Sequence, residues 1–93
     1  MKNISVGDVV LSMAGRDKGE NMIVVDVNEK FVYVVDGKKR KVSNLKKKNL
    51  KHLEKVKDLA CFELAERIRD KQAVSNDKVK KAIKSVVNKK EEK

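Results

Sequence analysis

The chain has 93 residues, enough for one small domain with a short appendage. Only 3% of its residues are aromatic, so its core must be built from Val, Ile and Leu. It has no run of about 18 apolar residues, which excludes a membrane span. Residues 1–5 lack the apolar segment of a secretory signal, so we expect a cytoplasmic protein.

The excess of positive charge is concentrated in one segment. Residues 1–35 carry a net charge of −1 and residues 58–93 a net charge of +3, whereas residues 36–57 carry 10 basic and 2 acidic groups, a net charge of +8. Such a block is costly in a compact chain unless an anion offsets it. We therefore expect a polyanionic partner, and the alternative is a solvated face that keeps the protein soluble.

Cys61 is the single cysteine of the chain, which excludes an internal disulfide and a multi-cysteine zinc site. We expect no metal, no cofactor and no catalytic residue. The single histidine, His52, is nine positions away, and no third group is apparent that would orient a Cys–His pair. Cys61 is expected to be a small buried hydrophobe in a protein that is not an enzyme.

Apolar and polar residues alternate in the first half of the chain, which predicts strands near residues 9–13, 22–27 and 31–36. Asn28-Glu29 is short enough for a tight hairpin. Asp36-Gly37 predicts a type I′ turn, which needs φ > 0 at both central positions.

After that turn, the residues from Lys38 to Ser43 are expected to form a basic fourth strand, followed by a turn at 44–45 and a short closing strand at 50–53. Val42 and Leu45 are expected to be core residues. Four or five such strands predict a small β-barrel whose interior is filled by side chains, with no cavity for a small-molecule substrate. Function would then lie on the loops and the outer face.

From about residue 57 the apolar spacing changes to that of helices. One stripe contains Leu59, Phe62, Ala65 and Ile68, and a second follows the N-cap candidates 75–77. The second stripe contains Val79, Ala82, Ile83, Val86 and Val87. The sequence thus predicts a mainly β fold with α, divided into a barrel over residues 1–55 and a helical extension over residues 56–93. A homodimer through the second stripe is compatible with this fold.

The order of motifs in residues 6–53 gives a more specific expectation. A Gly-Arg-Asp-Lys-Gly loop lies between two apolar strands, and an apolar strand with Asp-Gly, a basic strand and an Asn-Leu-Lys-His-Leu closure follow. The segments are 6–10, 15–19, 24–27, 31–37, 39–42 and 49–53. Together they resemble the KOW motif, most closely that of archaeal- and eukaryotic-type large-subunit ribosomal proteins and their small bacterial relatives.

The resemblance implies an SH3-like β-barrel that binds ribosomal RNA or the ribosome and acts in translation. Small residues in the loop would let an RNA backbone approach, and cations would bind its phosphates. The expected RNA-binding loop consists of Met13, Ala14, Gly15, Arg16, Asp17, Lys18 and Gly19. The expected basic strip consists of Lys38, Lys39, Arg40, Lys41, Lys46, Lys47, Lys48 and Lys51.

Other interpretations of these residues stay open. The barrel resembles the KOW domains of elongation factors as well, so it could instead bind an acidic protein partner such as the transcription machinery. The loop could be an ordinary hairpin in which Asp17 pairs with Arg16 or Lys18. Phe31 or Tyr33 could stack on a base, although we expect Phe31 to pack in the core, and His52 could contact RNA or be structural.

Overall fold

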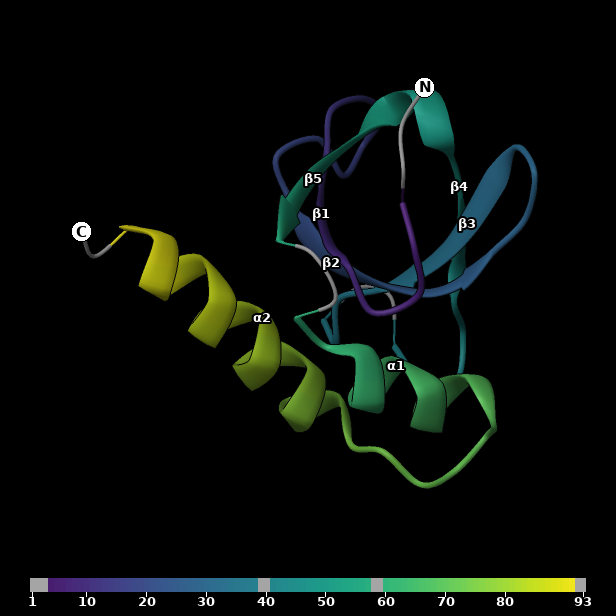
Figure 1. Cartoon of the computed structure of the whole chain (residues 1–93), viewed down its shortest axis with the longest axis vertical. Helices are drawn as coiled ribbons and strands as arrows, with labels where there is room; N and C mark the ends of the chain where they lie inside the picture. Colours follow the sequence, from purple (N-terminus) through teal and green to yellow (C-terminus); the bar gives the residue numbers. More distant parts are fainter. Residues whose placement is uncertain (1–3, 39–40, 58–59, 92–93) are drawn as a thin grey trace.

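The structure is a computed structural model that describes residues 4–38, 41–57 and 60–91. Five strands form one antiparallel sheet in the order β4-β3-β2-β1-β5, and two helices lie below it in Figure 1. The elements are β1 (Val9–Ser12), β2 (Asn21–Val27), β3 (Phe31–Val35), β4 (Lys46–Asn49), the 3-10 turn η1 (Leu50–His52), β5 (Leu53–Lys57), α1 (Phe62–Arg69) and α2 (Asn76–Glu91).

The first three predicted strands and the two predicted helices are confirmed. A tight hairpin joins β2 to β3, in which the Asn28 N–H donates to the Phe31 carbonyl at 2.8 Å. The two edges of the sheet are β4 and β5, which do not pair with each other in the part of the chain that the structure describes. The fold is therefore a mixed α/β arrangement built on an open sheet.

Each face of the sheet carries a buried cluster, since successive side chains of a strand point to opposite sides. The first cluster lies on the face of the sheet that points away from the helices. It consists of Ile4, Val10, Met22, Val24, Val32, Val34 and Leu53, with Leu50 packed against it. The second cluster lies on the opposite face, where the helices pack. It consists of Val9, Ile23, Val25, Val35, Cys61, Ala65, Ile68, Val79 and Ile83.

The first helix is held against the sheet by a close backbone approach at Gly7. The Cys61 N–H donates to the Gly7 carbonyl at 2.9 Å, and a Cβ on Gly7 would lie 2.4 Å from the Cα of Phe62. Gly7 also has φ +95°, a conformation that side chains disfavour. Position 7 therefore needs a residue without a side chain, since it packs against the first residue of α1. Cys61 is buried in this contact, as expected from the sequence.

The second helix begins at the predicted N-cap region. The Lys78 N–H donates to Ser75 Oγ at 3.2 Å, whereas Asn76 Oδ1 accepts from the Val42 N–H at 2.9 Å. Asn76 therefore ties the start of α2 to the loop between β3 and β4. Val79 and Ile83 bury the apolar stripe against the chain's own sheet, while the C-terminal end of α2 projects away from it (Figure 1).

The predicted fourth strand is wrong. Lys38 lies in a bend, and the residues from Lys41 to Asn44 form a turn in which the Asn44 N–H donates to the Lys41 carbonyl at 2.8 Å. Lys39 and Arg40 lie outside the described residues. At the predicted turn, Gly37 has a positive φ but Asp36 does not, so it is not type I′. The lysine-rich segment 46–49 forms β4 instead, and its register pairs Val32 with Lys48.

The predicted closing strand is displaced as well, since residues 50–52 form η1 and the strand itself is β5. The expected boundary after residue 55 falls inside β5. Both described helices fall short of the length and apolar character needed to cross a membrane.

Candidate nucleic-acid interface

The loop between β1 and β2 is fixed at its base by backbone hydrogen bonds. The Gly19 N–H donates to the Ser12 carbonyl at 2.8 Å, and the Met13 N–H donates to the His52 carbonyl of η1, also at 2.8 Å. Gly15 and Gly19 have φ +88° and +92°, a backbone conformation that glycine adopts more readily than other residues. The loop is a closed turn that rests against η1.

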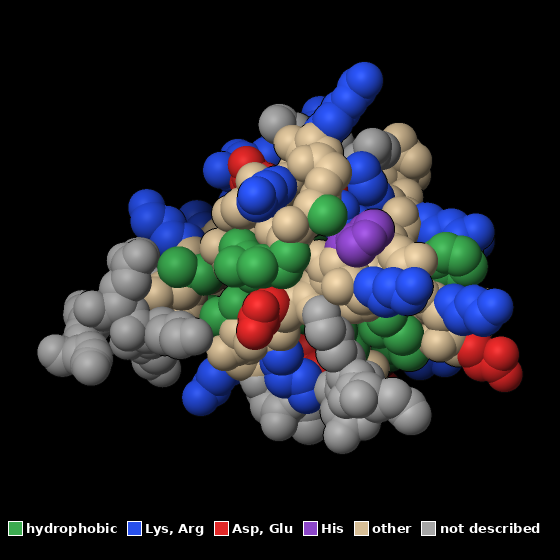
Figure 2. Space-filling view, turned by 90° about the horizontal axis from the view of Figure 1, so that it is seen from above, with side chains coloured by type: hydrophobic (Ala, Val, Ile, Leu, Met, Phe, Trp, Pro, Cys, Tyr) green, Lys and Arg blue, Asp and Glu red, His purple; other side chains and the backbone are tan. Residues whose placement is uncertain are grey.

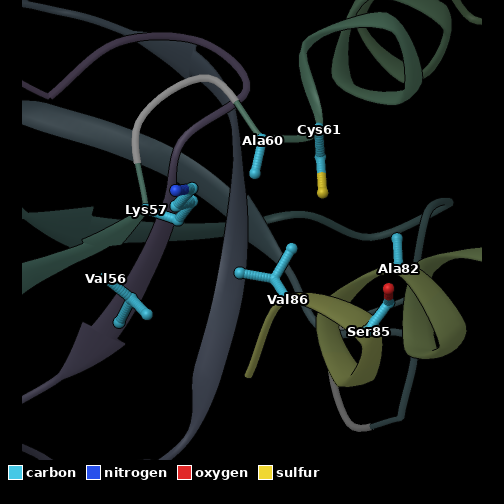
Figure 3. A pocket seen from close by; sticks show the side chains of 7 residues that line it. All are labelled: Val56, Lys57, Ala60, Cys61, Ala82, Ser85 and Val86. Carbon is cyan, nitrogen blue, oxygen red and sulfur yellow. The ribbon is translucent and has the colours of Figure 1, made fainter. Parts of the chain in front are cut away.

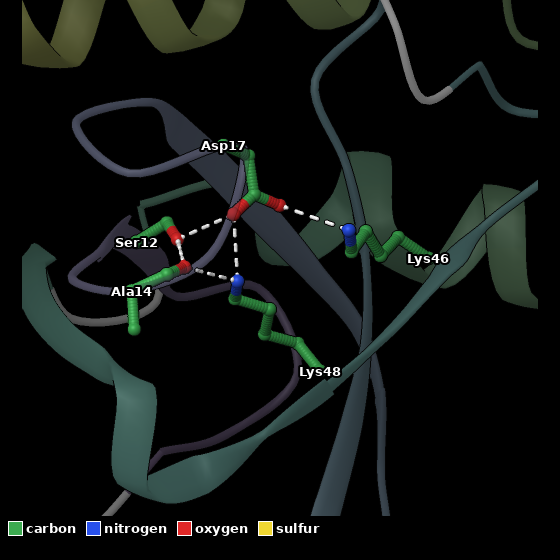
Figure 4. Close-up of polar contacts among 5 residues, drawn as sticks. All are labelled: Ser12, Ala14, Asp17, Lys46 and Lys48. Carbon is green, nitrogen blue, oxygen red and sulfur yellow. Dashed lines mark hydrogen bonds and ion pairs between the residues drawn. The ribbon is translucent and has the colours of Figure 1, made fainter.

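Inside the loop, the carboxylate of Asp17 is the centre of a buried polar cluster (Figure 4). Asp17 Oδ1 accepts hydrogen bonds from Lys48 Nζ at 2.6 Å and from Ser12 Oγ at 2.8 Å. Asp17 Oδ2 lies 3.4 Å from Lys46 Nζ in an ion pair. Lys48 Nζ also donates to the Ala14 carbonyl at 2.8 Å. The cluster therefore ties the loop to β4.

These contacts set the protonation state of Asp17. Burial alone would raise the pKa of this carboxyl, but the hydrogen bonds from Lys48 and Ser12 and the charges of Lys48 and Lys46 outweigh it and lower the pKa to about 2. Asp17 is therefore a carboxylate at neutral pH. It pairs with Lys48 and Lys46 and not, as the ordinary-hairpin interpretation assumed, with Arg16 or Lys18.

The cluster turns the remaining residues of the loop toward solvent. Arg16 and Lys18 are exposed, and so are Gly15 and Gly19. Met13 is 43% exposed and Ala14 is half-buried. By contrast, Asp17 is only 8% exposed. The loop thus exposes two cations, the backbone of its two glycines and the flexible apolar side chain of Met13. Its single carboxylate, that of Asp17, is buried.

The lysines of β4 and η1 do not form one uniform strip. Lys48 is 6% exposed and points into the loop, as does the half-buried Lys46, because alternate residues of a strand share a face. Lys47 points to the other face, and its Nζ lies 4.2 Å from the centre of the Phe31 ring. Lys51 is exposed on η1. Figure 2 views this end of the molecule, where Lys and Arg side chains surround hydrophobic ones.

The basic residues before β4 lie elsewhere. Lys38 and Lys41 are both exposed. Lys38 lines a groove of about 600 Å³ between the sheet and α2. This groove has a mixed charge, because its lining also includes both lysines and acidic residues, namely Lys80, Lys81, Lys84, Glu20, Asp36 and Asp77. The predicted strip is thus divided between the loop end of the sheet and the helical side.

Part of the basic block is neutralised by the protein itself. The acidic residues of the first segment reach it across the sheet: Asp17 pairs with Lys46 and Lys48, and the fully buried Asp8 lies 3.4 Å from Lys55. These three lysines therefore do not belong to the uncompensated charge from which the sequence predicts a polyanionic partner. Among the lysines and arginines of the loop, β4 and η1, those that are exposed are Arg16, Lys18, Lys47 and Lys51.

The aromatic residues lie outside both buried clusters. Phe31 and Tyr33 are half-buried on β3, on the face opposite Val32 and Val34, and Phe62 is 44% exposed on α1. The expectation that Phe31 packs in the core is therefore wrong. The alternating pattern placed Phe31 and Tyr33 on one face, but it could not show that of the three residues on this face of β3 only Val35 is buried.

A second hollow lies where β5, the start of α1 and α2 meet, and has a volume of about 780 Å³. Figure 3 shows Cys61 Sγ pointing into it, with Val56 and Val86 nearby. Burial raises the pKa of the Cys61 thiol, which keeps it protonated and a poor nucleophile. His52 is exposed on η1 and does not line this hollow. Among the described residues, no group of His, Cys, Asp and Glu could hold a metal ion.

Ser12 was not among the predicted site residues, although its hydroxyl holds Asp17. A signal for it exists in the sequence, because a lone Ser at an inward position of an apolar strand needs a polar partner.

No protein-family model matches the chain.

Proposed function

We propose that this protein binds RNA through the 13–19 loop and the adjacent lysines of β4 and η1, and that its RNA partner is ribosomal. The observation that carries the proposal is the Asp17 cluster. It holds Arg16 and Lys18 on a preorganised, exposed turn and removes the carboxylate that would repel phosphate. A turn that is already ordered loses less conformational entropy on binding.

The strand order is compatible with the SH3-like barrel that the resemblance implies, with β4 and β5 as the two edges that would close it. Strands β1 to β4 lie beside one another in sequence order, and β5 lies on the other side of β1. The 3-10 turn η1 connects β4 to β5. The register shift between Val24 and Asp26 bends β2, as curling of the sheet requires. In such a barrel the ends of the strands carry the binding loops, which is where the 13–19 loop and η1 meet.

Phosphate contacts of this kind give affinity through counterion release. The expected mechanism is therefore recognition of folded RNA by shape and charge, with little sequence information from the loop itself. Such binding weakens as salt rises. Residues 1–55 would supply the contact, and the helices would support the sheet.

The test is an RNA-binding titration at several salt concentrations, using ribosomal RNA as the probe. The double variant Arg16→Gln/Lys18→Gln should lose affinity and flatten the plot of log affinity against log salt by about 1.5 units, at roughly 0.7–0.9 per phosphate contact. The matched control is Arg67→Gln/Lys78→Gln, which removes two exposed cations from α1 and α2. The control should bind like the wild type.

Equal loss in both double variants would mean that net charge, and not the loop, determines binding. Absence of RNA binding at low salt would overturn the proposal and favour an acidic protein partner. The ultraviolet spectrum gives an early check. The chain has one Tyr and no Trp, so co-purified RNA should dominate its absorbance until high salt removes it.

A further inference from the structure

The outer face of β3 and β4 carries two aromatic rings with no role in the core. Phe31 and Tyr33 are two residues apart on one strand, so both point to the same face at a spacing of about 6.6 Å. Neither belongs to a buried cluster, and both are half-exposed. The chain has three aromatic residues, and two of them lie on this surface.

Basic and polar groups surround the two rings. In the register of β3 and β4, Lys47 lies beside Tyr33 and Asn49 lies beside Phe31. The Lys47 ammonium lies over the Phe31 ring at 4.2 Å from its centre. On the other side of Tyr33, the carboxylate of Asp26 is paired with Arg69 at 3.7 Å. The only carboxylate among these neighbours is therefore offset by a cation.

This surface is continuous with the 13–19 loop. The Leu50 N–H at the start of η1 donates to the Lys30 carbonyl beside Phe31 at 3.1 Å, and the His52 carbonyl at its end accepts from Met13. The 3-10 turn thus bridges the base of the loop and the start of β3. A single RNA strand that contacts the loop can continue over η1 onto the two rings.

We propose that Phe31 and Tyr33 form a stacking surface for unpaired bases of the bound RNA, with Lys47 as its phosphate contact. This inference rests on the proposed function and specifies its ligand as RNA with a single-stranded segment. Paired bases are stacked on each other and cannot reach the rings, whereas unpaired bases stack readily on aromatic side chains.

The contact between Lys47 and Phe31 does not block the surface. A cation over an exposed ring is a weak contact, and a stacked base contributes more. Lys47 is exposed, so its side chain can move from the ring to a phosphate when a base arrives. The lysine holds the ring in the free protein and becomes a phosphate ligand in the complex.

The chain contains its own probe for this contact, because Tyr33 is the single Tyr and there is no Trp. Tyrosine emission therefore reports on Tyr33 alone. A single-stranded RNA of about 12 nucleotides should quench it on binding, whereas the same strand annealed to its complement should not. N-acetyltyrosinamide in parallel titrations corrects for light absorbed by the RNA.

Affinity measurements on variants give the second arm. Phe31→Leu and Tyr33→Leu should each weaken binding of the single strand roughly 5- to 150-fold and leave its salt slope unchanged, because no charge is removed. Tyr33→Phe keeps the ring and should bind like the wild type. Phe62→Leu, which removes the exposed ring of α1, is the matched control and should also bind normally. Thermal melting checks that each variant is folded.

Wild-type affinity in folded Phe31→Leu and Tyr33→Leu would overturn the inference while leaving the proposed function intact. Unquenched Tyr33 at saturating single strand would do the same. Failure of the wild type to bind either RNA would overturn the inference together with the proposed function.

Discussion

The ammonium of Lys48 donates a 2.6 Å hydrogen bond to the carboxylate of Asp17, a residue 31 positions earlier in the chain. The pair joins the edge strand β4 to the loop between β1 and β2, and both partners are almost fully buried. Removing Asp17 would leave the buried Lys48 ammonium with the neutral Ala14 carbonyl but without its carboxylate, which costs more than the pair itself contributes.

The first prediction concerns pH. The pKa of Asp17 is lowered to about 2 in the folded protein from an ordinary value of 3.8, so its stabilisation is present above about pH 4 and is lost as the pH falls toward 2. The shift corresponds to about 2 kcal/mol. Denaturant unfolding of the wild type and of Asp17→Asn should differ most at neutral pH and converge near pH 2. A difference between the two proteins that stays constant from neutral pH to pH 2 would contradict this prediction.

The second prediction separates Lys48 from the exposed cations of the loop. Lys48→Met should lower RNA affinity, because the loop loses its anchor, but should not change the slope of log affinity against log salt. Arg16→Gln alone should reduce that slope by about 0.7–0.9. If Lys48→Met reduces the slope as much as Arg16→Gln does, Lys48 must leave Asp17 in the complex and bind a phosphate itself. That would be the role that the sequence predicts for it.

The third prediction concerns the approach of α1 to the sheet. Gly7→Ala should lower the free energy of unfolding by about 2–4 kcal/mol, because the new Cβ meets the backbone of Phe62 and the backbone conformation is strained. Gly19→Ala is the control: its φ is similar, but a Cβ there meets nothing within 4 Å. It should cost only the strain, about 1 kcal/mol. Equal losses in chemical denaturation would argue against the close contact.

The fourth prediction concerns α2. Val79 is fully buried against the sheet, so Val79→Ala should destabilise the protein by roughly 1–3 kcal/mol through the cavity it leaves. Because the contact is within one chain, the melting temperature should not depend on protein concentration. A melting temperature that rises with concentration in the wild type would indicate that the stripe of α2 also joins two copies.

The sequence predicted the local parts of this fold well. Alternation located β1, β2 and β3, and helical spacing together with Ser75 located α1 and α2. It failed at the fourth strand, where Asp36-Gly37 and a basic run containing Val42 have the pattern of a hairpin. The actual strand contains three consecutive lysines, which disfavour a strand unless a distant partner compensates them. That partner is Asp17, and nothing local in either segment indicates the pairing.

The same limit applies to the candidate site. The sequence grouped Arg16, Asp17 and Lys18 as equivalent loop residues, and only the tertiary contacts separate the buried carboxylate from the exposed cations. It also placed Phe31 in the core, because an apolar strand residue is most often buried. How far the helices extend over the sheet decides that question, and extent of coverage is a property of the whole fold.

The lysines of β4 have a consequence for how the protein behaves when crowded. An open sheet offers an unpaired strand at each edge, and such edges can recruit strands from neighbouring molecules and start aggregation. At one edge, Lys46 and Lys48 point inward and Lys47 points outward, so a strand added there would meet charge on both faces. At the other edge, β5 exposes Glu54, Lys55 and Lys57. Charged side chains at both edges therefore disfavour the pairing of this sheet with a strand from another molecule.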